Sequence, residues 1–377
     1  MPIIVSTGAS GGGSSVADGI TKTVGPGAED FSTIQEAIDW FKDYSLIGAC
    51  KVDITAGTYA EQLDLTDLIC GSEASLELEG DTRVLAGISY VDGADCNEAG
   101  LANGGSGVIT LANGGNNITV VGSVSNPDFD AAGWTTGDKV LIKDNAGVVA
   151  EYTLGTAMNQ ILVLTVAAPA LGNDGTSIML IPSVRVEKSI GDSDIVLAKN
   201  SRGIVLDGIF VKSTGTDVCI KADYMSMLTL ENVAAQCASG NGVYADRNST
   251  IIADGGAVSV WECDMFGYTA TRNSFIDASY SVSVDCPSGY VAMEHSGIYA
   301  LDAIATESSS EGFWAYELSY IMAIYATARQ CTVGYYAQKR GYIDATATNA
   351  NNGGNGADYD PAANDTQGNS LASITWN

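Results

Sequence analysis

Short runs in which apolar and polar residues alternate recur along most of this chain. Residues 250–253, 281–284 and 341–347 place β-branched, aromatic or small apolar residues at every second position, which is the pattern of strands with one buried face. The C-terminal half holds no apolar pattern of 3.6-residue period long enough for a helix. The pattern therefore predicts an all-β chain built from many short strands.

A sequence repeat accompanies these runs. It is marked by six alanines, Ala222, Ala245, Ala270, Ala292, Ala315 and Ala337. The steps between them are 23, 25, 22, 23 and 22 residues, and a glycine stands three residues before each of the last five. A fixed period in this range indicates a solenoid, in which each unit buries its apolar face against its neighbours. Leucine is too sparse for a leucine-rich repeat. We therefore predict a right-handed parallel β-helix with about 23 residues per coil and rungs about 4.8 Å apart.

Stacked coils predict columns, which are side chains at equivalent positions of successive coils. The residue after each glycine and the alanine two positions later are expected to point inward, and the residue between them outward. A further inward column consists of Cys237, Cys263, Cys286, Ser309 and Cys331, because free cysteines pack as small hydrophobes. The expected outward column just before it consists of Gln236, Glu262, Asp285, Ser308 and Gln330.

Charge and cysteine spacing exclude several functions. The chain has 17 basic and 45 acidic residues, one histidine and a formal charge of −28. Nucleic acid is excluded as a partner, because phosphate binding needs clustered Lys and Arg. The eight cysteines form no C-x-x-C pair, which with a single histidine excludes a zinc site. No segment approaches the ~18 apolar residues of a membrane span, and no signal peptide is expected at residues 1–6.

Residues near the N-terminus predict a short helix that caps the solenoid. Ser32 is the expected N-cap residue, with Gln35 three positions later as its capping-box partner. The apolar stripe of this helix consists of Ile34, Ala37, Ile38 and Phe41. The residues Asp-Phe-Ser-Thr-Ile-Gln-Glu-Ala-Ile at 30–38, followed by Gly-Thr-Tyr-Ala-Glu at 57–61, resemble the N-terminal cap of the pectin-lyase-like superfamily of β-helices.

The chain divides into five segments by composition. They are a Gly/Ser-rich docking arm (1–27), the cap with the first coils (28–95), an inserted domain (96–185), the main β-helix (186–347) and an Asn/Gly-rich end (348–377). The insert loses the coil period, and its short strands with Asn/Gly turns predict a small β-barrel or sandwich. It either binds a neighbouring protein or a glycan, or is decoration. The insert and the Tyr-x-Pro-x-x-Asn sequence near the end resemble those of phage tail fibres and tailspikes.

This resemblance implies a structural protein of a phage tail, a homotrimeric fibre or spike found in the virion and outside the host after lysis. Its arm would attach to other tail or baseplate proteins, and its solenoid would contact host-surface polysaccharide. Two alternatives stay open. One is a tailspike depolymerase, acting as a glycoside hydrolase or lyase. The other is an extracellular adhesin or filament subunit.

Enzymatic activity is the less favoured expectation, because the catalytic patterns of the resembled family do not occur. The lone His295 lies in Glu-His-Ser-Gly rather than Gly-His-Gly. The best catalytic candidates are Glu262 and Asp285, which would lie one rung apart, about the 5 Å separation of a retaining glycosidase. Glu307 and Glu311 would lie near the next rung. This acidic column alternatively binds calcium, the one cofactor considered, or is a solvated face.

Outward aromatic residues form the second candidate site. The expected group consists of Tyr244, Trp261, Trp314, Tyr316 and Tyr336. Aromatic rings of this kind stack on sugars and are also enriched in protein interfaces. The group is therefore predicted to bind carbohydrate or to be buried between subunits of a trimer, and burial is the favoured alternative.

Overall fold

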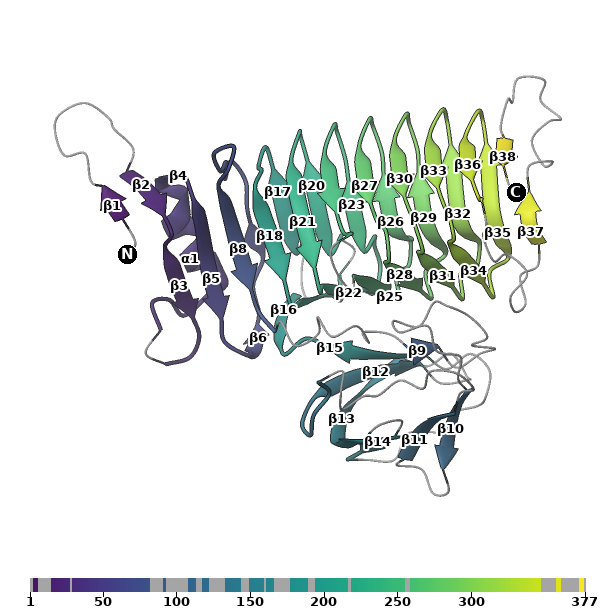
Figure 1. Cartoon of the computed structure of the whole chain (residues 1–377), viewed down its shortest axis with the longest axis horizontal. Helices are drawn as coiled ribbons and strands as arrows, with labels where there is room; N and C mark the ends of the chain where they lie inside the picture. Colours follow the sequence, from purple (N-terminus) through teal and green to yellow (C-terminus); the bar gives the residue numbers. More distant parts are fainter. Residues whose placement is uncertain are drawn as a thin grey trace.

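The computed structural model describes residues 3–5, 15–27, 29–81, 91–92, 108–112, 117–121, 133–143, 149–158, 161–165, 177–188, 194–215, 218–254, 258–346, 357–360 and 373–375. The chain is mostly β and forms a parallel β-solenoid of about nine turns, with about 24 residues per turn. The solenoid is long and narrow, and the two termini lie at its opposite ends (Figure 1). The predicted solenoid and its period are confirmed.

Three parallel sheets run along the solenoid. The 11-stranded sheet consists of β3 (Thr21–Val24), β5 (Ala49–Ile54), β8 (Ser75–Glu79), β18 (Ile204–Asp207), β21 (Met227–Glu231), β24 (Thr250–Ile252), β27 (Phe275–Asp277), β30 (Gly297–Tyr299), β33 (Tyr320–Met322), β36 (Tyr342–Asp344) and β38 (Ser373–Thr375). The 8-stranded sheet consists of β6 (Gly57–Tyr59), β16 (Val184–Lys188), β19 (Ile209–Ser213), β22 (Ala234–Cys237), β25 (Ser259–Trp261), β28 (Val282–Val284), β31 (Ile304–Thr306) and β34 (Thr327–Arg329). The 9-stranded sheet consists of β7 (Leu63–Asp64), β17 (Val196–Lys199), β20 (Ile220–Asp223), β23 (Val243–Ala245), β26 (Phe266–Ala270), β29 (Ser288–Ala292), β32 (Glu311–Tyr316), β35 (Val333–Gln338) and β37 (Ala357–Asp360).

The alanine repeat lies in the 9-stranded sheet and is in register there. Each of the six alanines pairs with the next along the solenoid, and all six are fully buried. Two residues before the alanines, the rings of Tyr268, Tyr290, Phe313 and Tyr335 stack with centroids 4.8–5.0 Å apart and planes within 6° of parallel. The predicted inward columns are therefore confirmed.

A glycine column explains why no larger residue precedes these rings. A Cβ atom at Gly289 would lie 2.7 Å from the carbonyl oxygen of Gly312 and 2.8 Å from the Cβ of Ala305 in the 8-stranded sheet. Both distances are shorter than van der Waals contact. The glycines thus let the 9-stranded and 8-stranded sheets approach each other closely.

A serine ladder, not anticipated from the sequence, lies at the turns that lead into the 11-stranded sheet. Six of these turns end in a buried serine. Five of the six serines follow two successive residues at positive φ, such as Arg272 (52°) and Asn273 (65°), and the first serine follows one such residue, Asn200 (51°). The N–H of each serine donates to Oγ of the serine one coil further on, at 3.1–3.2 Å, through Ser201, Ser226, Ser249, Ser274, Ser296 and Ser319. These bonds satisfy buried backbone groups that the turn leaves without a strand partner.

The sulfur column is inward and buried as predicted, at Cys237, Cys263, Cys286 and Cys331. On the rung between Cys286 and Cys331, where the column has no cysteine, the inward residue differs from the expected Ser309. Ser308 is buried, whereas Ser309 is exposed. The coil from Cys286 is therefore 22 residues long, one fewer than the 23 that the expected Ser309 required.

The capping helix α1 (Ile34–Lys42) begins one residue later than predicted. Its N-cap is Thr33, and Glu36 rather than Gln35 completes the capping box. The predicted apolar stripe is confirmed, since Ile34, Ala37, Ile38 and Phe41 are all fully buried. The carboxylate of Glu61, the last residue of the Gly-Thr-Tyr-Ala-Glu motif, accepts the N–H groups of Ile34 and Gln35 at 2.9 Å. The two cap motifs thus contact each other, because a helix N-terminus stabilises a carboxylate.

Part of the predicted arm belongs to the folded solenoid. Strand β2 (Ser15–Asp18) pairs with β4 (Tyr44–Leu46) and, antiparallel, with β1 (Ile3–Val5). Strand β3 pairs with β5 in the first coil. At the other end of the chain, β37 and β38 continue the 9-stranded and 11-stranded sheets by one rung. Residues 6–14, the glycine-rich centre of the arm, lie outside the described residues.

The insert is one antiparallel sheet that lies along the 8-stranded sheet (Figure 1). Its strands, in spatial order, are β10 (Val108–Ala112), β11 (Asn117–Val121), β14 (Ile161–Leu164), β13 (Val149–Met158), β12 (Lys139–Lys143), β15 (Ser177–Ile181) and β9 (Val91–Asp92). The described strands thus form a small antiparallel sheet, and the barrel or sandwich stays a prediction. Strand β9 precedes the expected start at residue 96, and Val184 already pairs with Gly57 of the solenoid.

An apolar cluster holds the insert against the solenoid. Leu141, Met179 and Ile181 of the insert pack with outward side chains of the 8-stranded sheet, among them Phe210 and Trp261. Because the sheet is covered in this way, its outer face is apolar as well as its inner face. Burial of Trp261 and its neighbours stabilises this contact by about 25 cal/mol per Å² of apolar surface.

Candidate functional site

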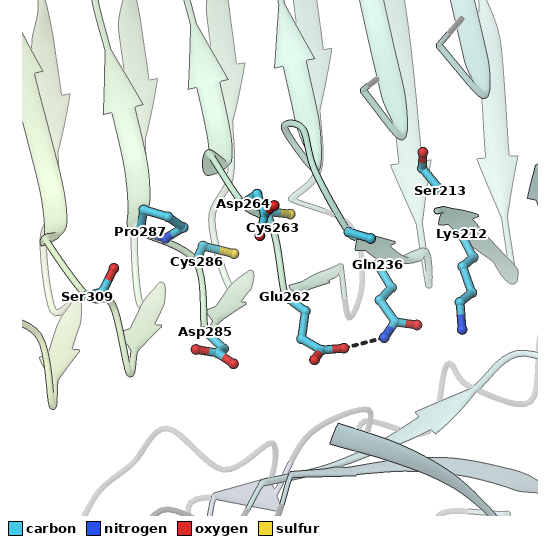
Figure 2. A pocket seen from close by; sticks show the side chains of 11 residues that line it. Lys212, Ser213, Gln236, Glu262, Cys263, Asp264, Asp285, Cys286, Pro287 and Ser309 are labelled. Carbon is cyan, nitrogen blue, oxygen red and sulfur yellow. Dashed lines mark hydrogen bonds between the residues drawn. The ribbon is translucent and has the colours of Figure 1, made fainter. Parts of the chain in front are cut away.

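A polar pocket of about 400 Å³ lies where the strands of the 8-stranded sheet end. Its lining includes Lys212, Gln236, Glu262, Asp264, Asp285 and Ser309. In Figure 2 the side chains of Lys212, Gln236, Glu262 and Asp285 follow one another along the solenoid and point toward the insert. The pocket thus combines ammonium, amide and carboxylate groups, one per coil.

Backbone conformation sets the acidic column of this pocket. Glu262, Asp285 and Glu307 each follow the last residue of a strand and have φ of 50°, 54° and 58°. Their N–H groups donate to carbonyl oxygens of the next coil. Glu262 donates to Val284 and Asp285 donates to Thr306, at 3.0–3.1 Å. Positive φ is uncommon for residues other than glycine. Here the positive φ allows one additional outward residue between the end of the strand and the inward residue that follows.

This geometry corrects the predicted column. Glu307, rather than Ser308, lies one rung beyond Asp285, because Ser308 belongs to the inward sulfur column. Gln236 is a strand residue that pairs with Trp261 and precedes the added outward residue. Glu262 and Asp285 are on adjacent rungs as expected, so their backbones are about 4.8 Å apart.

The environment of Glu262 favours its protonated form. Burial raises the pKa of the Glu262 carboxyl, although the amide of Gln236 donates to its Oε2 and opposes this shift. The neighbouring Asp285 carboxylate raises the pKa further, and Lys212 and Lys143 lower it by a smaller amount. A carboxyl group whose pKa is raised by burial is a candidate general acid.

Lys143 is a candidate site residue that was not predicted from the sequence, as is Lys212. Lys143 ends strand β12 of the insert, and its ammonium group lies 3.1 Å from Oδ2 of Asp285 and also contacts Glu307. Burial alone would lower the pKa of Lys143, but the two carboxylates outweigh burial and raise it. A single lysine at the end of a strand carries no sequence signal that would assign it to a site in another segment.

Glu311 lies apart from this group. It begins β32 in the 9-stranded sheet and accepts a hydrogen bond from Oγ of Ser288 at 2.6 Å. Three of the four candidate catalytic acids are therefore brought together, and Glu311 is not part of the polar pocket.

The aromatic candidates divide into three places. Trp314 contacts Tyr316 and Tyr336, with ring centroids 5.5 and 6.2 Å away, on the outer face of the 9-stranded sheet. Tyr244 lies closer to the N-terminal end of that sheet, where its hydroxyl is 3.0 Å from Oγ1 of Thr271. Trp261 points outward as expected but is fully buried beneath the insert. It is corrected to a core residue.

One acidic group within the described residues is close enough to share a cation. Carboxylate oxygens of Glu77, Glu79 and Asp207 lie within 4.8 Å of one another on the 11-stranded sheet. The ammonium group of Lys51 already contacts Glu79. In the polar pocket, Lys143 likewise supplies positive charge beside Asp285 and Glu307. Calcium binding at the acidic column stays a prediction.

No helix among the described residues has the length and apolar character needed to cross a bilayer. No protein-family model matches the chain, and no curated protein sequence matches it. Solved structures do match, and those below are phage tailspikes.

The tailspike gp61 of Pseudomonas phage phi297 matches with 9% identity over 84% of this chain and 72% of that chain, at a TM-score of 0.19. The tailspike gp49 of Pseudomonas phage LKA1 matches with 11% identity over 85% and 69%, at a TM-score of 0.24. The gp54 tailspike of Acinetobacter baumannii bacteriophage AP22, solved in complex with A. baumannii capsular saccharide, matches with 7% identity over 92% and 76%, at a TM-score of 0.20. The protein is a parallel β-solenoid with structural matches to phage tailspike proteins.

Proposed function

We propose that this protein is a tail fibre or tailspike-type structural protein that attaches to a phage tail or baseplate and contacts host-surface polysaccharide. The observation that carries the proposal is the polar pocket, in which Lys212, Gln236, Glu262 and Asp285 follow one another along the solenoid. Sugar hydroxyls both donate and accept hydrogen bonds, and this series offers donors and acceptors in turn. An extended glycan lying along the solenoid axis meets a new side chain at each rung.

The remaining parts of the chain fit the same role. A right-handed β-helix is stiff, because each coil is bonded along its length to the next. The Gly/Ser-rich arm would attach the protein to the tail or baseplate. The aromatic group of Trp314, Tyr316 and Tyr336 lies on the outer face of the 9-stranded sheet, whereas the described apolar cluster of the insert packs on the 8-stranded sheet. Burial of this face between three subunits would form the trimer, and stacking on sugar rings is the alternative use of it.

Binding of purified protein to host-surface polysaccharide tests the proposal. Gln236→Ala removes an amide of the pocket without creating a charge, and we expect it to weaken binding about tenfold. Asp53→Asn on the exposed face of the 11-stranded sheet is the control and should bind as the wild type. Equal binding by all three proteins would exclude the pocket as the glycan site.

A polysaccharide depolymerase is the second candidate, and the raised pKa of Glu262 beside Asp285 supports it. Glu262 would donate a proton to the glycosidic oxygen, and Asp285 would act as nucleophile or stabilise the developing positive charge. The spacing of one rung suits a retaining enzyme, whose carboxyl groups lie about 5–5.5 Å apart.

Product release separates this candidate from binding alone. Reducing ends and unsaturated products would be followed over time for the wild type, Glu262→Gln and Asp285→Asn. A depolymerase of this type loses about 100-fold or more of its rate in Glu262→Gln while still binding polysaccharide. Cleavage that is unchanged in both variants would exclude this pair of residues.

An extracellular adhesin or filament subunit would behave differently from both candidates. Such a protein should polymerise head to tail in solution, whereas a tail component should co-purify with phage particles. Fractionation of a lysate with an antibody against this chain distinguishes the two.

A further inference from the structure

A second hollow, about 350 Å³ in volume, lies on a different part of the solenoid from the polar pocket. It lies at the edge of the 11-stranded sheet where β27, β30 and β33 end. Its lining includes Asp254, Asp277, Tyr280, Tyr299, Leu301 and Met322. We call this hollow the tyrosine groove.

Register shows how the groove is built. Asp277, Tyr299 and Met322 are strand partners on three successive rungs. They point outward, because the residues before them, Ile276, Ile298 and Ile321, are fully buried and side chains alternate along a strand. The turn that follows each strand adds a second line of residues, including Leu301 and the exposed Tyr280.

The groove has a polar end and an apolar end. Asp254 and Asp277 lie in the earlier coils, and Leu301 and Met322 lie in the later ones. Tyr280 follows Asp277 in the same coil, and Tyr299 lies one coil further on. A pyranose ring has the same division, with C–H groups on its faces and hydroxyl groups around its edge. The tyrosine rings can take the C–H face, as aromatic rings do with other apolar groups, and carboxylates accept hydrogen bonds from hydroxyls.

The ring of Tyr299 is held in place before any ligand arrives. It packs edge-on against Phe275, with ring centroids 4.8 Å apart and an interplanar angle of 89°. On the next rung Tyr320 lies 6.2 Å away. Even so, Tyr299 is 39% exposed and Tyr280 is 55% exposed. An aromatic surface that is both fixed and accessible binds with little loss of side-chain entropy.

The charge of the groove lining favours a glycan over a protein as the ligand. Among the described residues, the lining of the groove includes two aspartates and no Lys, Arg or His. Covering it with a protein surface would bury both carboxylates, which is costly unless cations pair with them, and charged residues are depleted from interface cores. A sugar leaves its far side in water and supplies hydroxyl donors. A negatively charged sugar would be repelled by the two aspartates.

We propose that the tyrosine groove is a non-catalytic binding site for a pyranose unit without negative charge. It rests on the proposed function in that the ligand is a polysaccharide. Together with the polar pocket it gives the chain two contacts with one glycan, so that overall retention exceeds that of either site alone.

Titration of the full chain with uncharged hexasaccharides of glucose, galactose, mannose and N-acetylglucosamine tests the proposal, with hexagalacturonate as the anionic probe. Ligand-observed NMR would give each dissociation constant. We expect at least one uncharged hexasaccharide to bind, Tyr280→Ala to weaken that binding about tenfold, and hexagalacturonate to bind at least about tenfold more weakly than the uncharged ligand.

Tyr325→Ala is the matched control. Tyr325 has the equivalent turn position two coils further on, with φ of 57° against 60° for Tyr280 and 57% exposure against 55%, but it does not line the groove. Equal loss of binding in both variants would overturn the proposal. If Gln236→Ala weakens binding and Tyr280→Ala does not, the groove fails while the polar pocket stands. If no hexasaccharide binds, both fail.

Discussion

Ser274 shows how one small side chain serves two coils. Its Oγ accepts the N–H of Ser249 at 3.2 Å, and its own N–H donates to Oγ of Ser296 at 3.1 Å. Both serines adjoin turns at positive φ, where the backbone has no regular strand partner. The hydroxyl thus replaces a backbone acceptor at a buried position.

Ser274→Ala should lower the free energy of unfolding by about 1–3 kcal/mol, because it leaves the Ser249 N–H buried without an acceptor. Urea unfolding followed by circular dichroism measures the change. Ser309→Ala, at an exposed position, should shift stability by less than about 0.5 kcal/mol. Equal stability of the two variants would contradict the role given to the serine ladder.

Glu262→Gln should make the protein more stable than the wild type at pH 7. The folded-state pKa of Glu262 is raised, first by burial and then by Asp285. A raised pKa contributes stability below the unfolded value, about 4.3, and that contribution is lost as pH rises through the folded value. Glutamine does not titrate, so the difference in melting temperature should disappear near pH 4. Ser309→Ala, which is not ionisable, should show no such pH dependence.

At the scale of the strands, what could be predicted depended on whether a feature repeats in every coil. The alanine, glycine and aromatic columns were readable because each coil imposes the same packing on the same position. Glu307 was displaced by one position, because the coil between Asp285 and Glu307 is one residue shorter than the assumed 23. Trp261 was correctly predicted to point outward. Its burial beneath the insert depends on contacts between segments that the repeat does not encode.

The glycine column makes a prediction about how closely the sheets approach. Gly289→Ala places a Cβ 2.7 Å from the Gly312 carbonyl oxygen, so adjacent coils must shift, at a cost of about 1–3 kcal/mol. Gly155→Ala in β13 is the control, since its nearest atom would lie 3.4 Å away. Thermal unfolding of the two variants compares them. A Gly289 variant as stable as the Gly155 variant would show that the sheets do not need this glycine.

The contact between insert and solenoid depends on Lys143 as well as on the apolar cluster. Lys143→Met leaves Asp285 and Glu307 close together without their ammonium partner, and we expect a loss of about 2 kcal/mol or more at pH 7. The folded pKa of Lys143 is raised by these carboxylates. Its contribution is therefore complete below about pH 10.4 and is lost only above the folded value.

Lys139→Met is the control, because Lys139 is more exposed and lies 3.8 Å from its partner Glu151. The loss in Lys143→Met should therefore exceed the loss in Lys139→Met at pH 7. Thermal melts of the two variants and the wild type measure this difference. A loss in Lys143→Met no larger than that in Lys139→Met would mean that the ion pairs of Lys143 do not stabilise the contact between insert and solenoid.

At the scale of the whole molecule, the chain has a net charge of −28, and successive rungs place some of its acidic side chains next to one another. Burial, followed by neighbouring carboxylates, raises the pKa values of Glu77 and Glu231 on the 11-stranded sheet. Burial and Glu79 do the same for Asp207, against the opposing bond from Asn232. A solenoid repeats any surface charge every 4.8 Å or so, so like charges accumulate along a face unless their positions alternate.

These raised pKa values predict that the wild-type chain is more stable near pH 5 than at pH 8. Each contributes stability that is lost as pH rises through the folded value. The opposite sign holds for Asp30, whose pKa is lowered by hydrogen bonds from Thr23 and Lys22. The contribution of Asp30 to stability is lost only in stronger acid, below about pH 3.9.

We expect the melting temperature to be higher at pH 5 than at pH 8 by about 2 °C or more. Salt screens repulsion between exposed charges beyond about 10 Å at 0.1 M, so it should raise stability more at pH 8 than at pH 5. A melting temperature that falls between pH 8 and pH 5, or that salt changes equally at both, would mean that repulsion among these carboxylates does not limit the stability of the solenoid.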